Sequence, residues 1–212
     1  MKKTNETYGA QIIAYYTGYI VFIVSLLMII PILSSVAFME WNTMLDFMIS
    51  WSIATLIGIL MMIYGIKAKK SGSNMQWKHG FSIAAFAWIL LTILCAIPYL
   101  LSGHTKSLLD ACFDVMSGFT TTGLVLTQDL DHLSVGLNMW RHMLTFIGGQ
   151  GMVVLALTFL TKEIGGAYKM YVGEGKDIEL RPNIKGTTRH IWKISLIYLI
   201  IGTAVLWIAG MM

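Results

Sequence analysis

Long runs of uncharged, mostly apolar residues alternate with short polar segments along this chain. A bilayer-spanning helix needs about 20 predominantly apolar residues. Five runs reach or approach that length: Gln11 to Phe38, Phe47 to Ile66, Phe81 to Leu101, Met143 to Thr161 (extended back toward Leu137) and Ile194 to Met212. The pattern therefore predicts five membrane-spanning helices.

A shorter and more polar stretch, Ser107 to Leu124, lies between the third and fourth runs. From Leu108 to Ser117 its apolar residues recur at helical spacing. Ser107 followed by Asp110 is a capping-box pattern, and Gly118 is a favourable helix stop. The predicted helix would be roughly 16 Å long at about 1.5 Å per residue, which is half of a ~30 Å hydrocarbon core.

The predicted half-length helix is followed by Thr120, Thr121, Thr122 and Gly123. Consecutive β-branched residues favour extended backbone, and glycine allows turns that other residues resist. Extended backbone at membrane depth is tolerated where it is buried in protein or lines a watery cavity. Carbonyl oxygens there can replace the water shell of a monovalent cation. This pattern predicts an ion-selectivity filter at residues 119–124, and its alternative is an ordinary outer loop with a threonine-rich turn.

The positions of the charges predict the orientation. Two loops are rich in lysine or arginine, from Lys67 to Lys78 and from Lys162 to Lys193, whereas the loop with Glu40 and Asp46 has neither. The positive-inside rule places both basic loops and the N-terminus in the cytoplasm. An even number of crossings must separate the two basic loops. The segment from Ser107 to Leu124 is therefore predicted to enter from the outer face and return to it.

Composition supports an integral membrane protein, because 56% of the 212 residues are hydrophobic and 12% are charged, against about 25% charged in soluble domains. Cys95 and Cys112 lack metal-site spacing and are predicted to be buried thiols. The chain carries none of the common enzyme signatures. We therefore expect no enzymatic activity, no cofactor and no nucleic-acid partner.

These observations predict an all-α membrane protein: a transmembrane helix bundle with a re-entrant pore helix and an extended filter strand. The expected divisions are an N-terminal helix hairpin (1–70), a helix-pore-helix repeat (71–161), a basic cytoplasmic loop (162–193) and the first helix of a second repeat (194–212). One chain with one filter strand cannot surround an ion. Either several copies of the chain assemble around one axis, or the chain is the front part of a longer polypeptide with further pore repeats, and the second alternative is preferred.

Several motifs occur in an order and spacing that resemble the Trk/Ktr potassium-uptake family, in particular its TrkH branch. They are the segment from Phe113 to Gly123, Asp129 to Asp131, Trp140-Arg141, and Gly148 to Gly151. The resemblance covers nearly the whole chain. Gln150 and Leu124 depart from the methionine and alanine that are common at these positions in the family.

The resemblance implies a potassium-translocating subunit of the bacterial inner membrane, with its N-terminus in the cytoplasm. Such a subunit carries four helix-pore-helix repeats around a central path, and each repeat contributes a filter strand with one key glycine, here Gly123. The backbone carbonyls of Thr120, Thr121, Thr122 and Gly123 would bind K⁺ as the transported ion. The resemblance also implies a homodimer in the lipid bilayer and a cytosolic, nucleotide-binding regulatory subunit.

Other candidates have two interpretations each. Asp110 and Asp114, grouped with Gly118 as support for the pore helix, either attract cations or act as structural acceptors, and the structural role is preferred. The glycines Gly148, Gly149 and Gly151 allow either close helix packing or a gating bend.

Trp140 and Arg141 are expected at the membrane interface, where Arg141 is an anchor or pairs with a carboxylate. The alternative to transport is a membrane anchor or sensor whose basic loop docks a soluble partner.

Overall fold

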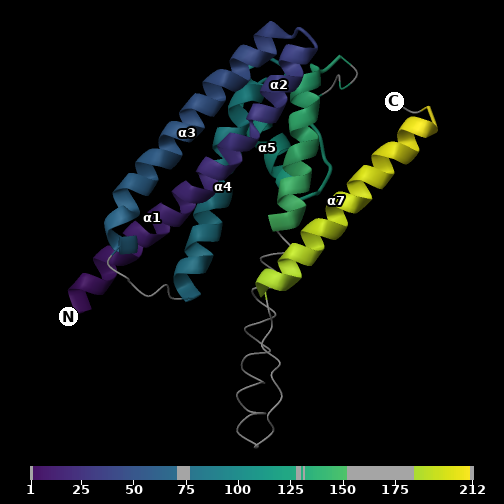
Figure 1. Ribbon diagram of the computed structural model, residues 1–212. Coiled ribbons are helices and arrows are strands. Elements are labelled where there is room, and N and C mark those ends of the chain that lie inside the picture. Colours follow the sequence, from purple (N-terminus) through teal and green to yellow (C-terminus); the bar gives the residue numbers. More distant parts are fainter. Residues whose placement is uncertain (1, 71–76, 128–129, 131, 152–183, 211–212) are drawn as a thin grey trace, which may run out of the picture. The chain divides into compact units, whose positions relative to one another are not determined.

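The computed structural model describes residues 2–70, 77–127, 130, 132–151 and 184–210. The chain divides into two compact units, Met1–Phe146 and Ile147–Met212. Helices account for most of the described residues, and no strand occurs among them. The predicted helical class is confirmed (Figure 1). The filter segment does not form the strand that the sequence suggested.

The first unit opens with a helical hairpin. α1 (Lys2–Leu27) and α2 (Ile29–Ala37) are separated by a turn at Met28, and α3 (Trp41–Lys70) runs back beside them. Glycines bring α1 and α3 into close contact. A Cβ added at Gly18 would lie 2.7 Å from the carbonyl oxygen of Gly58, and one at Gly65 would collide with the carbonyl oxygen of Gln11. Backbone packs directly on backbone, as small residues permit in membrane helices.

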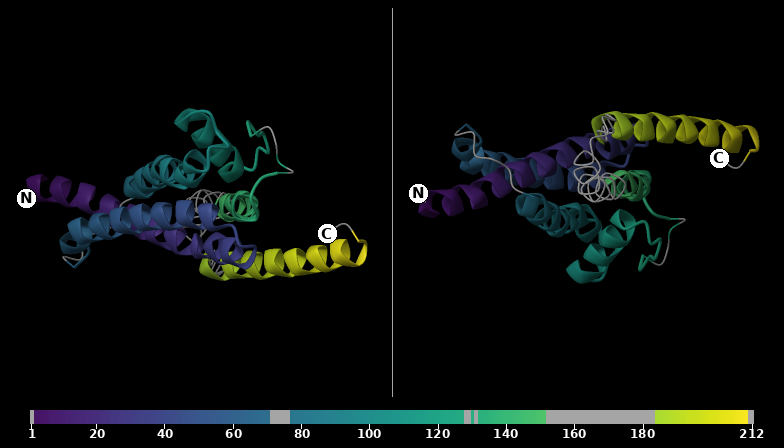
Figure 2. Two further views of the ribbon diagram at one scale, coloured as in Figure 1. Left: turned by 90° about the horizontal axis from the view of Figure 1, so that it is seen from above. Right: turned by 90° about the horizontal axis from the view of Figure 1, so that it is seen from below.

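A long helix and a short helix of the first unit follow the hairpin. α4 (Trp77–Leu101) packs on α1 and α3, and the shorter α5 (Leu108–Phe119) packs on α4. Figure 2 shows α5 on the α4 side of the hairpin. A further helix begins at residue 135 and is described as far as residue 151. It starts two residues before the predicted extension to Leu137.

Among the described residues, four helical segments are long and apolar enough to cross a membrane: Gly9–Ala37, Trp41–Lys69, His79–Leu101 and Arg189–Ile208. They match the first, second, third and fifth predicted spans. The fourth predicted span extends past residue 151, and its remainder lies outside the described residues.

The second unit contains the end of helix 135–151 and α7 (Ile184–Ile208). Most α7 side chains are exposed. The side-chain amide of Gln150 donates a hydrogen bond to Ser195 Oγ, at 2.9 Å. Gln150, which departs from the family pattern, thus ties two helices of this unit together. Most of the predicted basic loop, 162–183, lies outside the described residues.

Candidate functional site

The helix α5 begins where the sequence predicts. Ser107 is its N-cap, with extended backbone at φ −147°, and Ser107 Oγ accepts a hydrogen bond from the Asp110 backbone N–H at 3.1 Å. This bond satisfies one of the N–H groups that a helix start leaves unpaired. Asp110 places a negative charge in the first turn, where it complements the helix dipole.

The predicted end of α5 at Gly118 is wrong, because the helix continues to Phe119. Gly118 has another structural effect. A Cβ added there would lie 3.3 Å from Leu144 Cβ, which is tighter than most side-chain contacts. Its lack of a side chain therefore lets α5 approach helix 135–151.

A Schellman motif ends α5. Thr120 is the C-cap, with helical φ and ψ, and Thr121 has a positive φ of +55°. The Thr121 N–H donates to the Gly118 carbonyl and the Thr122 N–H to the Ser117 carbonyl, both at 3.0 Å. These two bonds define the motif. The prediction of three consecutive extended threonines is therefore wrong, because satisfying the last helical carbonyls outweighs β-branched preference at Thr121.

Threonine hydroxyls reinforce this turn. Thr120 Oγ1 donates to the Met116 carbonyl at 2.9 Å and lies 2.7 Å from Thr122 Oγ1. Back-bonding of this kind lets a threonine hydroxyl remain satisfied at a helix end without water. The two side chains thus form a small polar cluster on the exposed side of the turn.

Gly123 follows with a φ of +79°, and a Cβ added there would meet nothing within 4 Å. Glycine is required for backbone conformation at this position and not for space. Thr120, Thr121, Thr122 and Gly123 are all exposed within this chain. The described bonds that close the turn use carbonyls of Met116, Ser117 and Gly118. None of these bonds is accepted by a carbonyl of the four predicted filter residues.

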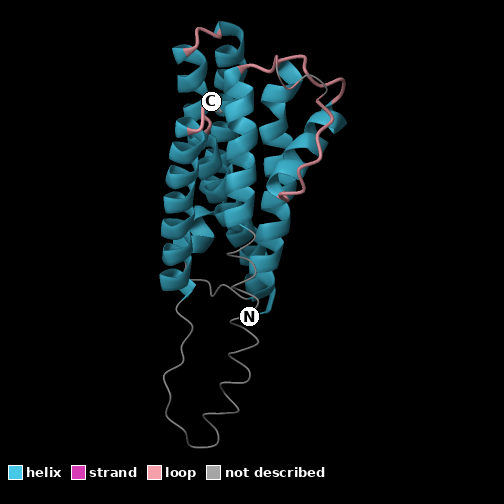
Figure 3. Ribbon diagram, turned by 90° about the vertical axis from the view of Figure 1, so that its right-hand side faces the viewer, coloured by secondary structure: helices cyan, strands magenta, loops and turns pink. Residues whose placement is uncertain are grey.

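After Gly123 the chain runs back along α5, and Asp114 holds it there. The Asp114 carboxylate accepts hydrogen bonds from the Leu126 N–H at 2.7 Å, the Thr127 N–H at 3.2 Å and the Thr127 hydroxyl at 2.6 Å. Figure 3 shows the loop after α5 returning toward the end of the bundle at which α5 starts. We call residues 124–134 the return segment. The structure gives Asp114 three donors from this chain.

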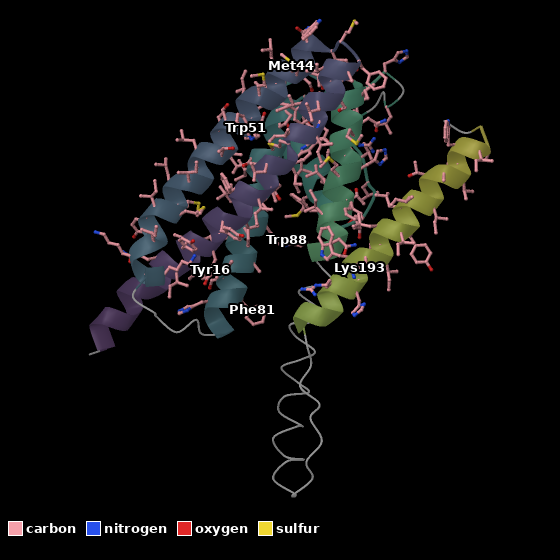
Figure 4. All side chains as sticks on the ribbon, viewed as in Figure 1. Tyr16, Met44, Trp51, Phe81, Trp88 and Lys193 are labelled. Atoms are coloured by element: carbon pink, nitrogen blue, oxygen red, sulfur yellow. The ribbon has the colours of Figure 1, made fainter. Side chains whose placement is uncertain are left out.

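The side chains of α5 divide into a buried face and an exposed face. Its buried apolar residues are Ala111, Val115 and Phe119, one helical turn apart, and Phe119 lies beside Trp88, which is labelled in Figure 4. Three bulky apolar side chains, Leu108, Leu109 and Phe113, are exposed. The polar side chains that the sequence grouped on a separate face include buried Asp114 and Ser117.

A small pocket of about 60 Å³ lies behind the turn, between α5 and helix 135–151. Its lining includes Tyr99, Ser117, Gly123, Arg141 and His142. Ser117 is 6% exposed, and its hydroxyl has no hydrogen-bond partner among the described residues. The pocket brings predicted filter and pore-helix residues next to Arg141, a proximity that the sequence pattern did not indicate.

Trp140 is not exposed as a side chain that anchors to the membrane interface would be. Trp140 is fully buried, packs edge-on against Phe47 and donates through Nε1 to the Cys95 carbonyl at 3.3 Å. Cys95 is a buried thiol, whereas Cys112 is only partly buried. The indole ring therefore anchors helix 135–151 between α3 and α4.

The three glycines near the end of helix 135–151 differ in their surroundings. Gly148 is buried and Gly149 half-buried, while a Cβ added at Gly151 would meet nothing within 4 Å. The packing and bending interpretations of these glycines both remain predictions. The acidic residues Asp129 and Asp131 lie outside the described residues.

Comparison with known proteins places this architecture in a family. Residues 52–211 match the family described as TrkH, cation transport protein. The chain is 31% identical over 205 residues to the Trk system potassium uptake protein TrkG of Escherichia coli, covering 94% of this chain and 41% of that protein. It is 34% identical over 184 residues to TrkH of Halomonas elongata, covering 84% of this chain and 37% of that protein.

The fold is also similar to a solved structure. The crystal structure of the potassium transporter TrkH from Vibrio parahaemolyticus matches with a TM-score of 0.77 and 25% identity, over 95% of this chain and 40% of that one. The chain thus spans about two fifths of the length of these relatives. The chain belongs to the TrkH family of cation transport proteins.

Proposed function

We propose that this chain is the N-terminal part of a membrane subunit that takes up potassium ions. In this proposal the carbonyl oxygens of Thr120, Thr121, Thr122 and Gly123 contribute one part of a selectivity filter, and further pore repeats complete it. Membership of the TrkH family supports the proposal, as do relatives that are described as potassium uptake proteins. Family membership also disfavours the alternative of a non-transporting anchor or sensor.

One observation carries the proposal: the chain reverses at the end of a 12-residue helix and is held against that helix by hydrogen bonds to the Asp114 carboxylate. A helix of this length is about 18 Å long and too short to span a bilayer. Its C-terminal end carries a partial negative charge, which favours a cation nearby. In the proposal, the carbonyls that the turn leaves available serve as oxygen ligands for a dehydrated cation near this helix end.

The remaining parts of the proposal concern the membrane and partners. The helix α5 and the return segment enter the bilayer from the outer face and leave by the same face, with the N-terminus in the cytoplasm of a bacterial cell. The orientation rests on the basic loops. A homodimer and a cytosolic nucleotide-binding regulatory subunit are the proposed partners. The subunit itself needs no cofactor, because the membrane potential supplies about 2.3 kcal/mol per charge and 100 mV.

The chain offers a matched pair of glycines for testing this function. Gly103 and Gly123 have φ values of +72° and +79°, and an added Cβ at either would meet nothing within 4 Å. Alanine should therefore strain the backbone equally at both positions. We expect Gly123→Ala in the full-length subunit to reduce rubidium uptake and potassium preference, whereas Gly103→Ala should leave both near wild type. Equal behaviour of the two variants would refute the filter assignment.

A cysteine-accessibility scan of residues 108–118 separates a re-entrant helix from a surface loop. We expect one face of α5 to be protected from a membrane-impermeant reagent added outside. Free labelling at every position would refute the re-entrant arrangement and support the anchor or sensor alternative.

A further inference from the structure

Glu40 lies in the turn between α2 and α3, before residue 52, where the family match begins. Its carboxylate accepts hydrogen bonds from two backbone N–H groups 95 and 96 residues further along the chain. Oε1 accepts from Val135 at 2.7 Å and Oε2 from Gly136 at 3.1 Å. These N–H groups belong to the first turn of helix 135–151 and have no partner within that helix.

The position of Glu40 is held by a strained turn. Met39 has a positive φ of +59°, although it is not glycine. The Met39 N–H donates to the Val36 carbonyl at 3.1 Å, and the Glu40 N–H donates to the Ser35 carbonyl at 2.8 Å, which forms a Schellman motif at the end of α2. Met44, labelled in Figure 4, begins the next helical bonds by donating to the Glu40 carbonyl at 3.0 Å. The backbone of Glu40 is therefore fixed on both sides.

The contact between this end of the hairpin and helix 135–151 is close as well as polar. Gly136 is buried, and a Cβ added there would collide with Ser35 Oγ and lie 3.0 Å from Thr43 Cγ2. The Pro31 carbonyl oxygen would be 3.3 Å away. The absence of a side chain at 136 lets helix 135–151 sit against α2 and α3 with both N–H groups within reach of Glu40.

The two carboxylates hold opposite ends of the return segment. Asp114 binds Leu126 and Thr127, just after the turn that contains Gly123. Glu40 binds Val135 and Gly136, where the return segment passes into a helix. A carboxylate at a helix N-terminus is favoured by both the unpaired N–H groups and the helix dipole. Helix 135–151 also lines the pocket behind Gly123, through Arg141, His142 and Leu144, so a displacement of this helix would change the surroundings of Gly123 directly.

We propose that Glu40 is a positioning residue for the selectivity filter. The N-terminal hairpin would thus set ion preference through the carboxylate of Glu40 and its contact with the start of helix 135–151. This inference rests on the proposed potassium uptake and adds to it a determinant that lies outside the helix-pore-helix repeat.

The test compares Glu40→Ala, Glu40→Gln and the control Asp46→Asn in the full-length subunit, expressed in bacteria that lack their own potassium uptake. The measured quantities are the KM for rubidium, the ratio of rubidium to sodium uptake, and the amount of subunit in the membrane. We expect Glu40→Ala to raise KM and to lower the ratio by about fivefold each, in the range typical of residues that couple distant sites. Glu40→Gln keeps one oxygen acceptor and should lie between Glu40→Ala and wild type, while Asp46→Asn should match wild type.

The outcomes are distinguishable. A wild-type subunit without rubidium uptake would refute the proposed function itself. A wild-type subunit that takes up rubidium, with an unchanged KM and ratio in Glu40→Ala, would refute only the positioning role. If Glu40→Ala does not accumulate, Gly136→Ala perturbs the same contact by collision with Ser35. An altered ratio in its surviving copies would support the proposal, and a wild-type ratio would overturn it.

Discussion

Asp114 and Thr127 are 13 residues apart, yet the Asp114 carboxylate binds both the N–H and the hydroxyl of Thr127, at 3.2 and 2.6 Å. The same carboxylate accepts from the Leu126 N–H at 2.7 Å. An ionised carboxylate has about four acceptor sites and no donor, so it suits three converging donors. These three hydrogen bonds hold residues 126 and 127 against the helix that carries Asp114.

Asp114→Ala should lower the stability of the protein because it leaves two N–H groups and a hydroxyl in a mostly buried position without acceptors. Hydrogen bonds to charged groups contribute roughly 1.5–3 kcal/mol each, and unpaired donors add a desolvation cost. We expect a loss of about 3 kcal/mol in the free energy of unfolding, measured by SDS titration in detergent micelles. Asp110→Asn, which removes a charge from the first turn of the same helix, should cost about 0.5 kcal/mol. Similar losses in both variants would contradict the role of the Asp114 bonds.

Gly65→Ala should destabilise the N-terminal hairpin. The added methyl would collide with the Gln11 carbonyl and lie 2.5 Å from Tyr15 Cβ, so α1 and α3 must separate. Overpacking of this kind costs about 1–3 kcal/mol.

The control for Gly65→Ala is Gly80→Ala in α4, because a Cβ there would meet nothing within 4 Å. That variant should be neutral or gain up to about 1 kcal/mol from helix propensity. Thermal unfolding in detergent would rank the two variants. A Gly65→Ala protein as stable as Gly80→Ala would show that the hairpin can separate without cost.

The helices could be predicted from sequence because their signals are local. The length of an uncharged run is by itself the signal for a membrane-spanning helix. The Ser107 cap depends only on Asp110, three residues later. The length of α5 was nearly right for the same reason. The sequence does not predict the last two helical residues, because glycine commonly ends a helix, whereas Gly118 lets α5 pack close to Leu144.

The contacts around the candidate site could not be predicted, because they join residues that are distant in sequence. Glu40 looked like an ordinary charge in an outer loop, and nothing local indicates that Val135 and Gly136 are its donors. Trp140 looked interfacial because tryptophan often is. Its burial depends on Phe47 and Cys95, which belong to two other helices.

Trp140→Phe tests how much the hydrogen bond of the buried indole ring contributes to stability. Phenylalanine keeps an aromatic ring against Phe47 but loses the Nε1–H donor to the Cys95 carbonyl. We expect a loss of about 1–2 kcal/mol, from one neutral hydrogen bond and a small loss of volume. Trp140→Ala should cost about 3–5 kcal/mol because it leaves a large cavity. SDS titration of both variants gives the comparison, and equal losses would mean that the hydrogen bond dominates.

Thr121→Gly should stabilise the end of α5, in contrast to the same change one residue earlier. Thr121 has a φ of +55°, and left-handed backbone costs a residue with a Cβ about 1–2 kcal/mol. Glycine removes that strain but adds freedom to the unfolded chain, so we expect a net gain of about 0.5–1 kcal/mol in the free energy of unfolding.

Thr120 has helical φ and ψ, and its hydroxyl donates a hydrogen bond to the Met116 carbonyl. Thr120→Gly should therefore lose about 1–2 kcal/mol, from one hydrogen bond and the greater flexibility of glycine. The opposite signs, measured side by side by SDS titration, are specific to a Schellman turn with Thr121 in the left-handed position. Two losses of equal size would indicate an extended threonine strand instead.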